Sequence, residues 1–367
     1  MENRIDYSFI EKCIENRICF AAYTLPDHNE FSIILQRSAH PIKFNVTDNY
    51  SNSKGFILAP FDTTIADKLL IVDDFLLTEN DINVDAWDFV KTTLPHKKYL
   101  HELPLATPYV TYLQQFDDFI SDLTNRRAKK LVLSRVITGY KKEHVSYAEL
   151  FKILNATYPN TFNYLLYTAN SGLWMGATPE QLLRINEEEA TTVALAGTQT
   201  LRNIELNKYV WGDKEREEQQ FVVDYVEKTI RKYTLDEKIN KSTQTIKAAK
   251  AVHLETSFKF NAHPISERLN EFLDDLHPTP AVCGVPKSSA LKLINETEHH
   301  DREFYSGFLG PLHIHQKTDL FVNLRCLKAE GNNLSLFVGG GITLSSKAQS
   351  EWEETALKAQ TLLSLIN

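Results

Sequence analysis

The sequence predicts an α+β protein whose strands pair mainly antiparallel. Four strand-like runs follow one another closely and are joined by turn residues: FNYLLYT (162–168), GLWMGA (172–177), QLLRI (181–185) and TTVALAG (191–197). Such short, closely spaced runs favour antiparallel pairing. Helical and strand-like segments are mixed without a regular βαβ alternation, so we expect α+β layers rather than a doubly wound sheet.

The first half of the chain combines strand-like pieces with two amphipathic helices. FSIILQRS (31–38) and KGFILAPF (54–61) are separated by short polar breaks. The apolar spacing of 109–127 predicts a helix, and a strand over 130–138 follows it. Ser146 and Glu149 form a capping-box pattern that predicts a helix over 147–156.

The second half predicts further helices and strands in turn. A long helix is expected over about 213–233, with shorter ones over 265–275 and 286–295. The expected strands lie within 304–315, 318–329 and 333–343. Ser350 and Glu353 predict the start of a final helix, 351–366.

Length and composition are those of a soluble globular protein. The 367 residues are 43% hydrophobic and 24% charged, with a formal net charge of −8. This charge does not favour binding to nucleic acid or an anionic membrane. The four cysteines lack metal-type spacing and are expected to be reduced, and the N-terminus lacks a signal-peptide core, so we expect a cytoplasmic protein. No linker is visible, and a single domain over 1–367 is expected, with 1–105 as a more variable flank of a core over 106–367.

AKKLVLSR (128–135) places a lysine in an apolar strand. Lys130, Val132 and Ser134 share one face, so a central strand would direct the amine of Lys130 towards the interior. The structural alternative is that Lys130 marks a strand end and extends its amine to water.

Three glutamates are candidate metal ligands. Glu218 lies on the same face as the apolar stripe of the 213–233 helix, and Glu351 and Glu354 are neighbours on the final helix, one turn before Lys358. They could form an oxygen site for Mg²⁺ with waters and a ligand oxyanion. The alternative for the final helix is a solvated face with a Glu354–Lys358 ion pair.

Two glycine-bearing strand ends and one arginine suggest anion binding. LAGT (195–198) and the glycines 339–341 would let the backbone approach a ligand and present N–H groups to it, although a turn or bulge explains either pattern as well. Arg325, taken to lie in an apolar strand, could pair with a protein carboxylate or grip a ligand carboxylate.

Together these pieces resemble the chorismate-binding enzymes, a family of isochorismate, salicylate, anthranilate and aminodeoxychorismate synthases. The resemblance covers about 110–367 and rests on ten motifs in family order. They are KLVLSR (130–135), GATPE (176–180), LAGT (195–198), KEREEQQFVVDYV (214–226), HLET (253–256), HPTPAVCG (277–284), REFYSGFLG (302–310), LRC (324–326), the glycine run 339–341 and EWEETALK (351–358).

The resemblance implies two large antiparallel sheets packed face to face, with helices outside and the active site in a deep cleft. It implies Mg²⁺ as cofactor, held by Glu218 and Glu354 with Glu351 acting through water, and joined to the ring carboxylate of chorismate. The implied substrate-contacting residues are Gly197, Thr198, His253, Ala281, Tyr305, Arg325, Gly339 and Lys358.

The resemblance also assigns the catalytic pair. Family members that add ammonia usually have glutamine where Lys130 stands, whereas those that add water have lysine. Lys130 would act as general base if desolvation leaves its amine partly neutral, and Glu180 of GATPE would protonate the leaving C4 hydroxyl. Ala196 takes the place of the nucleophilic lysine of one type of aminodeoxychorismate synthase, which excludes that covalent route.

The sequence is therefore interpreted as a Mg²⁺-dependent isochorismate synthase that acts on chorismate without a glutaminase subunit. The nearest alternative is a salicylate synthase, which eliminates pyruvate after the same first steps. An ammonia-using synthase and a catalytically silent binding module are the others. Isochorismate feeds both menaquinone and catecholate siderophores, and the sequence is compatible with either pathway.

Overall fold

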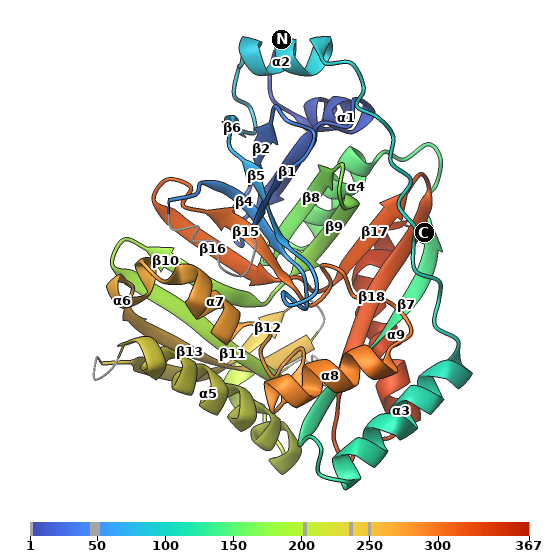
Figure 1. Ribbon diagram of the computed structural model, residues 1–367, viewed down its shortest axis with the longest axis vertical. Coiled ribbons are helices and arrows are strands. Elements are labelled where there is room, and N and C mark those ends of the chain that lie inside the picture. Colours follow the sequence, from blue (N-terminus) through green and yellow to red (C-terminus); the bar gives the residue numbers. More distant parts are fainter. Residues whose placement is uncertain (1–2, 45–51, 201–203, 235–237, 249–250, 367) are drawn as a thin grey trace.

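The computed structural model describes residues 3–44, 52–200, 204–234, 238–248 and 251–366, and in this part of the chain it contains two antiparallel sheets of nine strands each (Figure 1). Sheet I has the order β14-β7-β18-β17-β9-β8-β1-β2-β6. In that order the strands are Gly284–Val285, Lys130–Tyr140, Asn333–Ile342, Cys326–Glu330, Gly172–Thr178, Phe162–Thr168, Cys19–Thr24, Ser32–Gln36 and Phe75–Thr78.

Sheet II has the order β12-β13-β11-β10-β16-β15-β4-β5-β3. Its strands are, in that order, Asn240–Ala248, Ala251–Asn261, Glu189–Thr200, Gln181–Asn186, Lys317–Val322, Phe308–Leu312, Gly55–Ala59, Lys68–Val72 and Ile42–Phe44.

The two sheets pack face to face through a core that both supply. The rings of Phe162 in β8 and Phe321 in β16 stack with centroids 4.3 Å apart and an interplanar angle of 7°. Phe56 and Leu58 from β4 join them, opposite Trp174 from β9. Burial of this aromatic surface holds the layers together. The predicted pair of large antiparallel sheets is confirmed.

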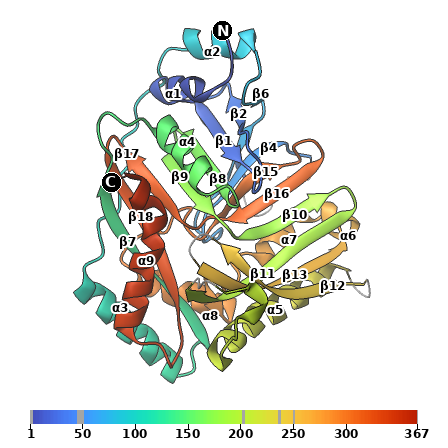
Figure 2. The ribbon, with the colours of Figure 1, turned by 180° about the vertical axis from the view of Figure 1, so that it is seen from behind.

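Helices cover the outer faces of both sheets. In chain order they are α1 (Tyr7–Glu15), α2 (Val84–Thr92), α3 (Tyr109–Thr124), α4 (Tyr147–Thr157), α5 (Asp213–Thr234), α6 (His263–Ser266), α7 (Leu269–Leu276), α8 (Lys287–Thr297) and α9 (Ala348–Ile366), with a 3₁₀ turn at Leu206–Lys208. α1, α4 and α9 pack on sheet I and α5, α6 and α7 on sheet II, while α3 and α8 lie along β7 (Figures 1 and 2). In the described residues, no helix combines the length and the apolar character that a membrane span requires.

Most predicted elements lie within a few residues of the observed ones. The strand predicted at 162–168 is β8, and the helix predicted at 213–233 is α5. The N-cap predicted at Ser146 is also confirmed, because its hydroxyl accepts a hydrogen bond of 3.1 Å from the Glu149 amide.

The single strand predicted over 318–329 is wrong. The chain forms β16 in sheet II, leaves that sheet at Asn323, and enters sheet I as β17. Arg325 has a φ of +49° and lies between the strands, not within one as expected. The Asn323 side chain fixes this crossing by accepting from Tyr164 Oη at 2.7 Å and donating to the Phe304 carbonyl at 2.9 Å.

Three other boundaries differ from prediction. The helix predicted over 265–275 is split into α6 and α7 because Arg268 leaves the helical region (φ −123°, ψ 31°). The last helix begins at Ala348 after a turn at 343–346, so Ser350 lies inside its first turn and is not its cap. The strand predicted within 304–315 is shortened to β15.

The N-terminal third contributes strands to both sheets. β1, β2 and β6 extend sheet I, and β3, β4 and β5 extend sheet II. Of these six strands, only β2 and β4 were predicted from the sequence as strand-like runs.

Candidate active site

The ends of β7, β18, β11 and β13 meet α5 and α9 around one cleft. The empty volume of this cleft is about 1070 Å³, part of it open to solvent, which is the size of a small-molecule site. The predicted site residues that line it are Lys130, Glu180, Glu218, His253, Ala281, Tyr305, Arg325, Gly339, Glu351, Glu354 and Lys358. Residues from segments more than 200 positions apart in the chain thus share one site.

Lys130 is buried at the start of β7. Its relative exposure is 2%, so the alternative in which its amine extends to water is wrong. Its Nζ lies 3.1 Å from Oε1 of Glu218 on α5. The strand therefore does direct a lysine amine into the cleft, where it lies beside the Glu218 carboxylate.

Glu180 occupies the turn by which the chain passes from β9 in sheet I to β10 in sheet II. Burial raises the pKa of Glu180 to about 7, although the nearby charges of Lys130, Arg325 and Lys358 oppose the shift. A carboxyl with this pKa is partly protonated at neutral pH and can donate a proton.

Arg325 occupies the second crossing between the sheets, from β16 to β17. Burial lowers the pKa of Arg325, while Tyr305, Glu354 and Glu180 raise it. The guanidinium remains charged at neutral pH and faces the cleft as a donor for an anionic ligand.

The acidic residues of two helices face each other across the glycine run of β18. Glu218 comes from α5, and Glu351 and Glu354 come from α9. A Cβ on Gly341 would lie 2.6 Å from Glu218 Oε1, and one on Gly340 would lie 3.2 Å from Glu351 Oε2. Glycine at these two positions lets carboxylates of both helices approach one strand.

The alternative of a solvated face is wrong for Glu351, which is only 5% exposed. The predicted Glu354–Lys358 ion pair does form, at 2.7 Å, and Lys358 also donates to the Gly339 carbonyl at 2.9 Å. The pair thereby ties α9 to the end of β18 at the rim of the cleft.

The carboxylates supply only oxygen donors, which suits a hard divalent cation such as Mg²⁺. They are spread around the cleft, because within the described ranges no three acidic, histidine or cysteine side chains come close enough to hold a metal by themselves. This arrangement fits an ion that needs further oxygens from a ligand and from water.

The predicted anion-binding strand end at LAGT contains a β-bulge. The register of β11 against β13 shifts between Ala196 and Thr198, and Gly197 has a φ of +62°. Leu195 and Ala196 line the cleft, whereas Gly197 and Thr198 are not among its described lining residues. The Thr198 side chain lies outside the described part of the structure.

His253 is paired with Thr198 across this bulge. Burial, together with the charges of Arg325 and Lys358, lowers the pKa of His253 to about 4. The imidazole is therefore neutral at pH 7.

Tyr305 faces the glycine run from the other side. Its ring stacks on Phe337 with centroids 5.5 Å apart, and a Cβ on Gly339 would lie 2.8 Å from its hydroxyl. Burial raises the pKa of Tyr305 to about 12, so the hydroxyl keeps its proton.

Two residues at the site were not predicted from the sequence. Glu215 lines the cleft one turn before Glu218, and the i,i+3 spacing could have revealed it. Gln219 accepts from the Ala196 amide at 2.9 Å and donates to the Ala194 carbonyl at 2.9 Å, thereby bracing the bulge. No pattern in the sequence indicates these two hydrogen bonds, because they depend on how α5 packs against β11.

Comparison with known proteins agrees with this architecture. The protein-family model described as "Chorismate binding enzyme" matches residues 83–367. Isochorismate synthase EntC of Escherichia coli (strain K12) is 30% identical over 267 residues, covering 71% of this chain and 68% of that protein. Isochorismate synthase MenF of Haemophilus influenzae is 26% identical over 331 residues, covering 86% and 76%.

Solved structures share the fold. The putative 2,3-dihydroxybenzoate-specific isochorismate synthase DhbC of Bacillus anthracis superposes with a TM-score of 0.76 at 20% identity, covering 98% of this chain and all of that one. The menaquinone-specific isochorismate synthase MenF of Escherichia coli gives 0.75 at 20% identity, covering 95% and 89%.

Proposed function

The chain belongs to the chorismate-binding enzyme family, and we propose that it is an isochorismate synthase, converting chorismate into isochorismate. The observation that carries the proposal is the pair formed by the buried amine of Lys130 and the carboxyl of Glu180, whose pKa is about 7. Both line the same cleft, so one group can accept a proton while the other donates one.

The reaction exchanges one hydroxyl for another. Lys130 takes a proton from a water molecule as the water oxygen bonds to ring C2. The C1–C2 double bond moves to C1–C6, the C5–C6 double bond moves to C4–C5, and the C4–O bond breaks. Glu180 protonates the departing hydroxyl, which leaves as water. One water enters and one leaves, so the product is an isomer of the substrate.

Cations in the cleft bind the two substrate carboxylates. Arg325 and Lys358 are the groups available to grip the enolpyruvyl carboxylate. Glu218 and Glu354, with Glu351 behind them, would hold Mg²⁺ against the ring carboxylate. The ion, when bound, neutralises that carboxylate and orients the ring. Gly197, Thr198, His253, Ala281, Tyr305 and Gly339 complete the proposed substrate site.

Water addition alone is proposed because the similar curated proteins carry the name isochorismate synthase. The names of relatives include menaquinone-specific and vibriobactin-specific enzymes, and the proposal covers the common reaction. Because water is the nucleophile, the reaction requires no ammonia-supplying glutaminase.

Incubation of the pure protein with chorismate and Mg²⁺, followed by NMR of the products, tests the proposal. Isochorismate as the sole product supports it. Salicylate with pyruvate would assign a salicylate synthase instead, and intact chorismate would refute the proposal.

A further inference from the structure

The strand that carries Lys130 has one fully paired edge and one nearly open edge. β18 pairs with β7 along Leu131–Tyr140, whereas β14 pairs only with Lys130 and Leu131. The Val132 amide still finds a backbone partner, donating to the Cys283 carbonyl at 2.8 Å. Beyond that point, side chains bond the open edge of β7 at Ser134, and Thr107 bonds it at Val136 through both its hydroxyl and its backbone amide.

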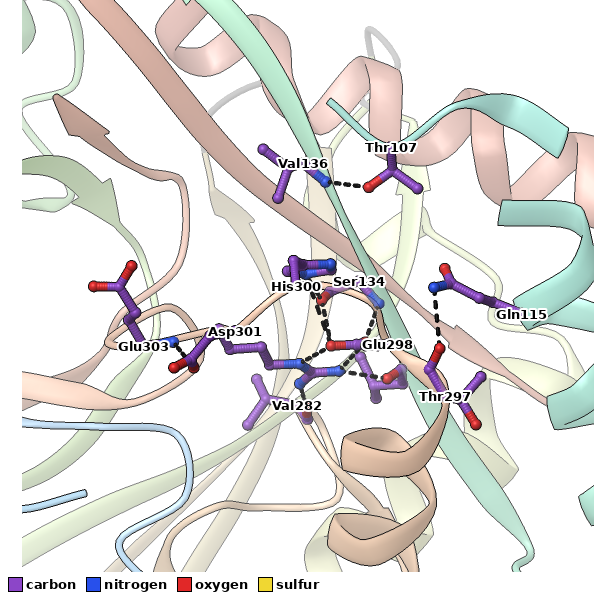
Figure 3. Close-up of polar contacts among 12 residues, drawn as sticks. Thr107, Gln115, Ser134, Val136, Val282, Thr297, Glu298, His300, Asp301 and Glu303 are labelled. Atoms are coloured by element: carbon purple, nitrogen blue, oxygen red, sulfur yellow. Dashed lines mark hydrogen bonds and ion pairs between the residues drawn. The ribbon is translucent and has the colours of Figure 1, made fainter. Parts of the chain in front are cut away.

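Two buried ionic side chains, Glu298 and Arg302, bond to this open edge of β7, and Figure 3 shows Glu298 beside Ser134. Glu298 accepts from the Ser134 amide at 2.7 Å and from its hydroxyl at 2.9 Å. Arg302 donates to the Val132 carbonyl at 2.7 Å. The two side chains grip each other through bonds of 2.7 and 2.6 Å, so each fixes the other against the strand.

The same arginine joins β7 to the neighbouring 281–283 segment, which also lines the cleft. Its Nη1 donates to the Val282 carbonyl at 3.0 Å, and Val282 lines the cleft beside Ala281. One guanidinium thus adds a side-chain link between the Lys130 strand and the 281–283 segment, beside the backbone bond from Val132 to Cys283. Arg302 also lies over the Phe61 ring, 4.2 Å from its centroid, which restricts its movement.

Stability alone does not account for this pair. Glu298 and Arg302 have side-chain exposures of 2% and 3%, and burying an ion pair is often no better than an apolar substitute. Such pairs can instead fix one arrangement of the surrounding backbone. Neither residue is among the described lining of the cleft, so neither touches substrate there.

We propose that Glu298 and Arg302 are positioning residues. They hold β7, the strand that carries Lys130, so that the Lys130 amine lies within proton-transfer distance of the attacking water. The inference rests on the proposed function, because it assigns these residues to the proton-abstraction step. A displacement of about 1 Å in a reacting group can lower a rate on the order of a hundredfold. Contacts at Val132 and Ser134, two and four residues from Lys130, can therefore control turnover.

Glu298→Gln tests the proposal because it keeps the shape but removes the negative charge and replaces one acceptor oxygen by an N–H₂ donor. Each oxygen accepts once from Ser134 and once from Arg302, so one bond to each residue is lost. We expect kcat to fall about tenfold to a hundredfold with KM near the wild-type value. The matched control is Lys68→Gln, which breaks another buried ion pair, 2.5 Å long to Asp274, in the outer part of sheet II. The control should lose stability but keep kcat. Wild-type kcat in Glu298→Gln, or an equal loss in both variants, would overturn the proposal.

Ser134→Ala provides a milder variant in case Glu298→Gln does not fold. It keeps the backbone bond but removes the hydroxyl that bonds Glu298 and, at 2.9 Å, His300. A severalfold lower kcat at an unchanged melting temperature supports the proposal, and an unchanged kcat contradicts it.

Hydrogen exchange of the Ser134 amide separates this inference from the proposed function. We expect faster exchange across 132–136 in Glu298→Gln and wild-type protection there in Lys68→Gln. If the wild-type protein left chorismate intact, the proposed function would fail, while this measurement would still decide whether Glu298 holds the strand. Unchanged protection in Glu298→Gln would show that Glu298 does not hold the strand.

Discussion

Glu180 and Arg325 stand at two points where the chain passes between the sheets, and the backbones at these crossings are hydrogen-bonded to one another. The Val322 amide donates to the Glu180 carbonyl at 2.9 Å, and the Ala177 amide donates to the Arg325 carbonyl at 3.1 Å. β9 pairs with β17 and β10 with β16, so the paired strands cross together. The proposed acid and an anion-binding cation are therefore fixed relative to each other by backbone.

Replacing Lys130 by glutamine should remove turnover while leaving the fold intact. The amide cannot accept a proton from water, and loss of a general base typically costs about 10²- to 10⁴-fold in rate. Steady-state kinetics with chorismate measures the effect. Lys328→Gln is the control, because Lys328 is an equally buried lysine, paired with Glu303 at 2.7 Å, that does not line the cleft. Full activity in Lys130→Gln would contradict its role as base.

The pKa of about 7 at Glu180 predicts that kcat/KM declines at alkaline pH. The acid must be protonated to deliver its proton, so the rate should fall about tenfold per pH unit once the pH exceeds this value. A pH profile from 5.5 to 9 measures the limb. Glu180→Gln should lack turnover over the whole pH range. If this variant kept the wild-type rate and the wild-type decline at alkaline pH, another residue would have to be the acid.

Glu180 also makes stability depend on pH. Its folded-state pKa is raised, so the protonated form favours folding and the stabilisation is lost as pH rises from about 4.5 to about 7. Relative to wild type, Glu180→Gln should gain stability between pH 4.5 and 8, by on the order of 3 kcal/mol. Denaturant unfolding at both pH values tests this, and a pH-independent difference would indicate that Glu180 is solvated.

Replacing Glu218 by glutamine should raise the Mg²⁺ concentration needed for half-maximal activity about tenfold or more. The reason is that a neutral amide oxygen is a weaker ligand for a hard cation than a carboxylate oxygen is. A Mg²⁺ titration at saturating chorismate measures it. Glu217→Gln is the matched control, since Glu217 is exposed on the same helix. Equal Mg²⁺ dependence in both variants would remove Glu218 from the proposed metal site.

Gly341→Ala should weaken the same site without unfolding the protein. The new Cβ would lie 2.6 Å from Glu218 Oε1 and 3.0 Å from Lys130 Cε, so both side chains must shift. We expect lower kcat and a higher Mg²⁺ requirement, with a modest change in melting temperature. Gly139→Ala, in the neighbouring strand β7, is the control because its contacts begin at an ordinary 3.5 Å. Wild-type kinetics in Gly341→Ala would show that the cleft has room there.

The sequence was most informative where local patterns determine structure. The spacing of apolar residues located β8 and α5, and the short joints between strands indicated antiparallel sheets. The alternation around Lys130 indicated a lysine on an inward face, and the structure places it in the interior.

Other features depend on contacts distant in sequence. Nothing in NLRCL marks Asn323–Arg325 as a passage between sheets, because an apolar run looks the same whether it stays in one sheet or leaves it. Gln219 resembles any helical glutamine until α5 packs against the β11 bulge. Glu298 and Arg302 form an i,i+4 pair typical of a surface helix, yet they lie beyond α8 and are buried against β7.

Two interior strands of sheet I are synthesised after the strands that flank them. β17 and β18 separate β7 from β9, although β9 is synthesised about 150 residues and β7 about 190 residues earlier. During translation the sheet therefore has a gap at its centre that stays unfilled until Ile342 has emerged from the ribosome, with Glu351 and Glu354 still to follow. Long-range closure of this kind slows folding and prolongs the exposure of unpaired strand edges. A nascent chain that stops before β18 would thus have a hole inside the sheet that supports catalysis, not a shortened end.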